Sequence, residues 1–267
     1  MKNILVLAHD DPGQEARLQA ALDVTRAVGG HLTCIDVTPI PVVMGEFESA
    51  TLGVMVMADA RAGEADNRRR TEARLANDDV PWTWIDATGD ISGSIERAST
   101  LADLIVVNNR LDSGIGPDMR EVASRTAVRT DRPVLAVPQD QAGLNLRGSV
   151  LVAWDGSPAA DSALRAAVPL LKFAEKVTLF EIDDGSLGAL AEEAAAYLSR
   201  YGIHPVVKRE RARLTRASPI ILSEIALGQY AYSVIGSYGR GRMAQSLFGG
   251  VTRSLLTSSR VPVFMAR

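Results

Sequence analysis

Residues 150–158, VLVAWDGSP, repeat the pattern of residues 4–12, ILVLAHDDP. Each segment is a short apolar run, then a polar turn, then a proline where a helical pattern begins. Two more pairs of segments recur in the same order and at comparable spacing: 102–107 with 231–236, and 132–137 with 261–266. Three ordered matches indicate that the chain is a tandem of two copies of one fold.

A polar stretch at 139–146 separates the two copies. We expect a first domain at 1–140 and a second at 146–267, and a chain of 267 residues has room for both. Within each copy, strand-like apolar runs alternate with helix-like segments. In the second copy the expected strands are 149–154, 176–182, 205–209, 231–236 and 261–266, and the expected helices are 158–173, 187–201, 218–228 and 247–258.

The expected strands are rich in Val, Ile and Leu, as parallel strands covered on both faces are. The sequence therefore predicts an α/β fold: two tandem, doubly wound, Rossmann-like domains, each with a five-stranded parallel sheet. The first copy is longer than the second. Its extra residues lie between strands expected at 31–37 and 81–86, and the stretch 39–57 within them contains three methionines.

Composition limits the classes of partner. The net charge of −3 argues against a general nucleic-acid-binding protein, which usually carries a basic face. No stretch approaches the roughly 20 apolar residues of a membrane helix, and the N-terminal apolar run is too short for a signal peptide. The sequence has one cysteine, Cys34, so an intramolecular disulfide is impossible. We therefore expect a cytoplasmic protein without a membrane partner.

A glycine-rich segment follows the strand expected at 231–236. Gly236 is followed after two residues by Gly239, and after nine more by Gly249 and Gly250, with Thr252 close behind. Glycines let backbone amides approach an anion without a Cβ in the way. The free amides and dipole of the next helix also attract anions. The strand–loop–helix context favours a phosphate site, although glycines after a strand also occur as plain turn residues.

This spacing resembles the universal stress protein (UspA-like) signature, Gly-x2-Gly-x9-Gly-Ser/Thr, and the resemblance covers nearly the whole chain in tandem. It implies the HUP, or adenine nucleotide alpha hydrolase-like, version of the fold. In ATP-binding members an aspartate after the first strand contacts the nucleoside, and the glycine loop holds the phosphates. The resemblance thus implies a site for ATP, with AMP or ADP as alternatives, at these positions of the second copy: Asp155, Gly236, Gly239, Gly249, Gly250 and Thr252. Gly250 stands where the family has Ser or Thr, so one hydroxyl is absent.

The first copy departs from the signature. With Pro133 aligned on Pro262, the signature positions are occupied by Val107, Arg110, Arg120, Glu121 and Ala123. A carboxylate would then stand where phosphate binds, and like charges repel. With Pro12 aligned on Pro158, His9 falls at the position of Asp155. We expect the first copy to be degenerate and retained for packing.

The leading hypothesis is a stress-response regulatory protein that binds an adenine nucleotide in its second domain. One alternative is a protein-interaction scaffold without nucleotide, and another is a weak ATPase or other ATP-using enzyme. The sequence has no evident nucleophile–base–orienter set and no Walker lysine, so no catalytic residue is assigned. Purified protein that carries ATP or AMP would favour the leading hypothesis over the scaffold.

The resemblance also implies that the last strands of the two copies, 134–137 and 263–266, pair within the chain as a pseudo-dimer. A further dimer of two such tandem chains is an additional hypothesis, with the methionine-bearing stretch 39–57 as a candidate surface. His9, His31 and His204 have no metal-ligand spacing, so no metal is expected. Cys34 is expected to be a buried, inert thiol.

Overall fold

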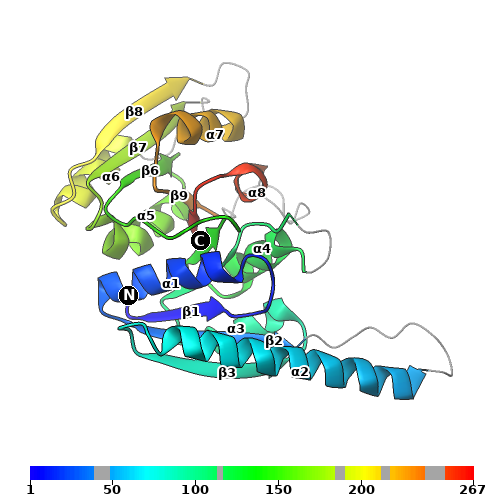
Figure 1. Cartoon of the computed structure of the whole chain (residues 1–267). Coiled ribbons are helices and arrows are strands. Elements are labelled where there is room, and N and C mark those ends of the chain that lie inside the picture. Colours follow the sequence, from blue (N-terminus) through cyan, green and yellow to red (C-terminus); the bar gives the residue numbers. More distant parts are fainter. Residues whose placement is uncertain (39–48, 113–116, 184–189, 212–216, 238–249) are drawn as a thin grey trace.

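The computed structural model describes residues 1–38, 49–112, 117–183, 190–211, 217–237 and 250–267, and the described side chains of the second helix begin at Ala62. Strands and helices alternate along the chain (Figure 1). The first half contains β1 (Asn3–Leu7), α1 (Gln14–Val28), β2 (His31–Thr38), α2 (Ser49–Leu75), β3 (Trp82–Thr88), α3 (Ile91–Ala98), β4 (Leu104–Asn108), α4 (Met119–Arg129) and β5 (Val134–Val137). The second half contains β6 (Ser149–Trp154), α5 (Pro158–Leu171), β7 (Lys176–Asp183), α6 (Ala191–Ser199), β8 (Val206–Arg211), α7 (Ala217–Gly228), β9 (Tyr232–Gly236), α8 (Gly250–Ser258) and β10 (Val263–Ala266).

All ten strands join one sheet in the order β3-β2-β1-β4-β5-β10-β9-β6-β7-β8. Within each half the five strands are parallel, which confirms the predicted doubly wound α/β fold. The two halves meet through β5 and β10, which are antiparallel, with Leu135 opposite Phe264. The predicted pairing of the last strands within the chain is therefore confirmed, and it merges the two five-stranded sheets into one.

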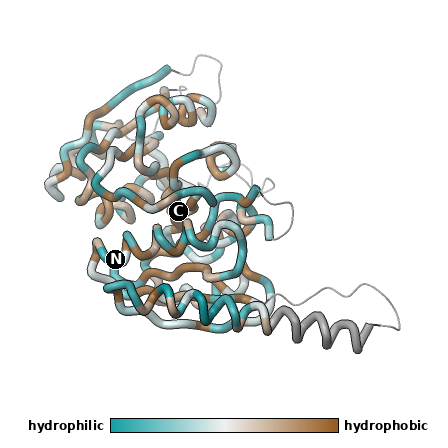
Figure 2. The backbone as a smooth tube through the Cα atoms, viewed as in Figure 1, coloured by the Kyte–Doolittle hydropathy of each residue, from teal (hydrophilic) through white to brown (hydrophobic). Residues whose placement is uncertain are grey.

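Helices cover both faces of the sheet because successive strand residues point to opposite faces. In β1, Ile4 and Val6 pack into the core beneath α1, whereas Leu5 and Leu7 pack into the core beneath α3 and α4. The first core also receives α5 and α6, and the second receives α7 and α8. The apolar colouring in Figure 2 follows these inner strands. None of the helices in the described ranges has both the length and the hydropathy needed to cross a membrane.

The edge strand β8 is far more polar and exposed than the apolar strand that we expected there. In β8, Val206 is 53% exposed and four charged residues follow Val207. β8 ends at Arg211, two residues beyond the end of the strand expected at 205–209. An edge strand has only one paired neighbour, and charges on it discourage pairing with another chain. Cys34 is buried as expected, and burial raises the pKa of its thiol to about 12.

The junction between the halves generates a first prediction. Val263 is fully buried in β10 opposite Ala136, so Val263→Lys should bury an unpaired ammonium and strongly destabilise the whole chain. Val206→Lys, on the exposed edge strand, is the matched control and should leave the melting temperature nearly unchanged. Thermal unfolding followed by circular dichroism measures both, and equal melting of the two variants would contradict the role of the junction.

Candidate functional site

Two adjacent strands, β6 and β9, bring predicted site residues to one edge of the second half. β6 pairs with β9 on one side and with β7 on the other, so strand order reverses between β6 and β9. Ligands of doubly wound sheets bind in the crevice at such a point, beyond the carboxyl ends of the strands. Asp155 follows β6 and Gly236 ends β9, so these two predicted residues lie at neighbouring strand ends.

The turn after β6 holds the start of α5. The Asp155 carboxylate accepts a hydrogen bond from the Ser157 N–H at 3.0 Å, and Gly156 adopts a left-handed φ of 68°, which glycine permits. The Ser157 hydroxyl caps α5 by accepting from the Ala160 N–H at 3.2 Å. Asp155 itself is exposed. The turn thus fixes the helix start and presents a carboxylate beside it.

Gly236 has a packing role that the sequence analysis did not foresee. A Cβ at this position would lie 2.6 Å from Ala159 C and from Ala160 N, in the backbone of the first turn of α5. Real Cβ atoms essentially never come this close to another atom. Gly236 is therefore required so that α5 can approach the end of β9, whatever binds beside it.

The rest of the glycine-rich segment is described in part. Gly239 and Gly249 lie outside the described residues. Gly250 is exposed at the start of α8, and Thr252 is buried at 3% exposure. Ser237 was missed because the family signature treats its position as variable. It is fully buried, and its hydroxyl has no hydrogen-bond partner among the described residues. A buried orphan hydroxyl at the crevice could donate to a bound anion.

The register of the strands corrects the alignment of the two halves. β9 residue Gly236 pairs with Ala266, and the corresponding residue of β5, Val137, pairs with Asn108. Gly236 therefore corresponds to Asn108 rather than to Val107, because the segments between these strands differ by one residue in length. The counterpart of Ala159 is Gly13, and a Cβ at Gly13 would lie 2.5 Å from Asn108 Oδ1. Each half thus has one glycine where the fourth strand meets the first helix. In the first half it is Gly13, at the start of the helix, and in the second half it is Gly236, at the end of the strand.

Arg17 fills the equivalent crevice in the first half. Its side chain is fully buried between the ends of β1 and β4. Nε donates to the Leu7 carbonyl at 2.5 Å, one Nη donates to Asp11 Oδ1 and Asn108 Oδ1 at 2.6 Å each, and the other Nη donates to the His9 carbonyl. The counterpart of Arg17 in the second half is Ala163. The first crevice therefore already contains its own cation.

A cluster of three ionisable side chains lies beside this crevice: His9, Asp36 and Glu64. One ligand atom from each lies within 4.8 Å of the other two, and His9 Nδ1 is 3.3 Å from Glu64 Oε1. Burial, followed by the contact with Glu64, raises the pKa of Asp36 to about 8. Burial opposes ionisation of Glu64, but His9 and Asp36 outweigh it and hold the pKa of Glu64 below its usual value. The spacing of the histidines in the sequence gave no sign of this cluster, because its three members come from the segment after β1, from β2 and from α2.

Fold and crevice define a class: a doubly wound α/β protein in which two copies of one fold share a single sheet. The chain belongs to the universal stress protein family. It is 31% identical over 199 residues to a universal stress protein of Mycolicibacterium smegmatis and 30% identical over 193 residues to one of Mycobacterium tuberculosis H37Rv. These alignments cover 66% and 63% of this chain and the same shares of the two relatives.

A solved structure extends the similarity in fold to nearly the whole chain. The crystal structure of a universal stress protein from Archaeoglobus fulgidus matches with a TM-score of 0.74 over 98% of both chains, at 21% sequence identity. No family model matches the chain. At this level of identity, the structural match establishes the arrangement of the fold and leaves the ligand to be argued from the residues themselves.

Arg17 generates the second prediction. Arg17→Met keeps an unbranched apolar side chain but leaves Asp11 and the Leu7 and His9 carbonyls without their donor, so it should destabilise the protein by about 3–5 kcal/mol. Arg165→Met removes an exposed arginine paired with Asp161 and should have little effect. Urea unfolding of both variants gives the comparison. A small effect at Arg17 would mean that its buried contacts are not needed for folding.

Gly236 generates the third prediction. Gly236→Ala should push α5 away from β9 and destabilise the chain by roughly 1–3 kcal/mol. Gly250→Ala is the control from the same signature, because a Cβ there would meet nothing within 4 Å. Differential scanning calorimetry should show a lowered transition for the first variant and an unchanged or raised one for the second. The opposite order would contradict the packing role of Gly236.

Proposed function

We propose that this chain is a stress-response regulatory protein that binds one adenine nucleotide, ATP, in its second half. Membership of the universal stress protein family and the glycine spacing between β9 and α8 support the proposal. The observation that carries it is the difference between the two crevices. Arg17 fills the first, whereas Ala163 and Gly236 place no long side chain at the corresponding positions of the second.

The proposed contacts follow from the chemistry of each group. Backbone N–H groups at Gly239, Gly249 and Gly250 would hold the phosphates, since glycine leaves the amide accessible and a helix start attracts anions. The exposed Asp155 carboxylate would accept hydrogen bonds from the nucleoside. Thr252 would supply a hydroxyl on the same helix.

Organisation and location complete the proposal. We assign the two domains to residues 1–140 and 146–267, joined by the polar segment between them and by the β5–β10 pair. A cytoplasmic location fits a chain whose sole cysteine is a buried free thiol. We propose binding rather than catalysis, because the sequence has no evident nucleophile–base–orienter set.

The fourth prediction tests the site. Gly239→Val places a branched side chain where the backbone must meet phosphate, so it should abolish the heat of ATP binding in calorimetry. Leu111→Val is the matched control, because counting from Asn108 places Leu111 at the corresponding position of the first half. Its affinity for ATP should equal that of the unmodified chain.

Other outcomes would support other functions. Undiminished binding by Gly239→Val would place the nucleotide elsewhere. The absence of heat with ATP, ADP and AMP would favour the scaffold alternative, and steady release of ADP and phosphate would favour the weak ATPase. Mass spectrometry of small molecules released from freshly purified protein provides an independent check for a bound adenine nucleotide.

A further inference from the structure

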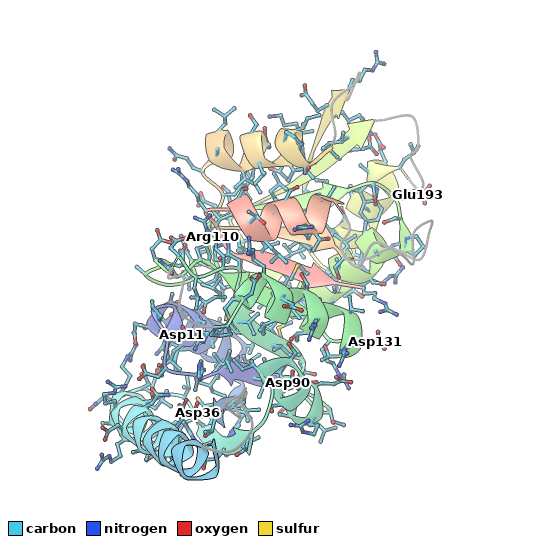
Figure 3. All side chains as sticks on the ribbon, turned by 90° about the vertical axis from the view of Figure 1, so that its right-hand side faces the viewer. Asp11, Asp36, Asp90, Arg110, Asp131 and Glu193 are labelled. Carbon is cyan, nitrogen blue, oxygen red and sulfur yellow. The ribbon has the colours of Figure 1, made fainter. Side chains whose placement is uncertain are left out.

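Three elements of the first half converge on the cluster of His9, Asp36 and Glu64. His9 follows the carboxyl end of β1, Asp36 lies near the carboxyl end of β2, and Glu64 comes from α2. The helix is docked there by Asn67, whose side-chain amide donates to the Ala8 carbonyl at 2.6 Å. Figure 3 shows Asp36 beside α2, in the half of the molecule opposite Glu193.

Two atoms of the cluster that can bind a metal ion, one on His9 and one on Glu64, have no hydrogen-bond partner among the described residues. His9 is 9% exposed, and its Nδ1 faces Glu64 Oε1 at 3.3 Å without hydrogen-bond geometry. Glu64 Oε2 is also buried and has no hydrogen-bond partner among the described residues. Asp36 is 2% exposed and accepts from the Val37 N–H at 2.8 Å and from the Asn67 amide at 3.5 Å. Two carboxylates thus share a buried space with one imidazole and neutral donors.

In the second half, an arginine neutralises the carboxylate at the corresponding position. By strand register the counterpart of Asp36 is Glu181, which is 1% exposed. Glu181 accepts from the Ala191 N–H at 2.8 Å and forms an ion pair of 2.5 Å with Arg209 on β8. In the first half, the residue that pairs with Asp36 on β3 is Asp86, another carboxylate. The compensating cation of the second half is therefore absent from the corresponding position.

Nearby arginines are engaged elsewhere. Arg17 pairs with Asp11, Arg70 pairs with Asp10, and Arg68 pairs with Glu72 and Asp86. Among the described residues, no ion pair reaches Asp36, and Glu64 pairs only with His9. Two buried carboxylates beside one imidazole favour either a shared proton or a bound cation, and the unpartnered His9 Nδ1 and Glu64 Oε2 are available to such a cation.

We propose that His9, Asp36 and Glu64 bind a divalent transition-metal ion. One imidazole nitrogen with two carboxylate oxygens is a donor set suited to Zn²⁺ and its neighbours in the first transition row. The ion would neutralise both carboxylates and occupy the orphan Nδ1, and water would complete its coordination. This site lies in the first half and is independent of the proposed nucleotide site. The degenerate copy therefore has a binding function of its own.

Titration of chelator-treated full-length protein with Zn²⁺ tests the proposal. Calorimetry should show one ion per chain, and His9→Gln and Asp36→Asn should each weaken binding by more than about tenfold. His204→Gln changes an exposed histidine of the second half and should leave the affinity unchanged. Thermal melting of the metal-free variants verifies that each is folded. Equal affinity in all three variants, or no saturable binding by the unmodified chain, would overturn the proposal.

A second measurement follows the histidines of the unmodified chain directly. The sequence contains three histidines, so nitrogen NMR of the imidazole rings can follow each one during the Zn²⁺ titration. His9→Gln should be used only to assign the His9 signal in this experiment. The Nδ1 resonance of His9 should shift at one equivalent of Zn²⁺, while His31 and His204 stay unchanged. Shifts confined to His31 or His204 would show surface binding and overturn the assigned site.

Discussion

Antiparallel pairing of β5 with β10 is the interaction on which the arrangement of both crevices depends. The six residues of the three paired positions are fully buried: Val134, Leu135, Ala136, Val263, Phe264 and Met265. Because strands are parallel within each half and antiparallel at the junction, the carboxyl edges of the two halves lie at opposite ends of the sheet. Each crevice is therefore built by its own half. The pairing also covers two edges that would otherwise be exposed to other chains.

Because each crevice is built by its own half, the two copies can differ in the side chains of their crevices while sharing the same backbone fold. The contact between the end of the fourth strand and the start of the first helix shows this directly. The first half uses Gly13 against Asn108, and the second uses Gly236 against the backbone at Ala159. Asn108 then orients Arg17, whereas the second half has no such pair. A small exchange of side-chain volume thus accompanies the presence of Arg17 in the first crevice and of Ala163 at the corresponding position of the second half.

The sequence predicted the fold well because its signals are local and repeated. Apolar runs, Pro158 after a polar turn and the ordered matches located the strands to within a residue or two. The alignment around Gly236 was wrong by one residue, because loop lengths differ and only strand pairing reveals it. The burial of Arg17 was predictable from the sequence, because Arg17 lies on the same face of its helix as the apolar residues Ala20, Ala21 and Val24. No sequence pattern predicted that His9 and Glu64 lie side by side, because this contact depends on how α2 docks after a long insertion.

The central claim is that one crevice is filled by the protein and the other is available to ligand. Native mass spectrometry of the full-length chain with excess ATP tests this claim most directly, because it counts bound nucleotides on each molecule. The account predicts one ATP per chain, lost when Gly239 is replaced by Val. Two ATP molecules per chain, or one that survives this replacement, would contradict it.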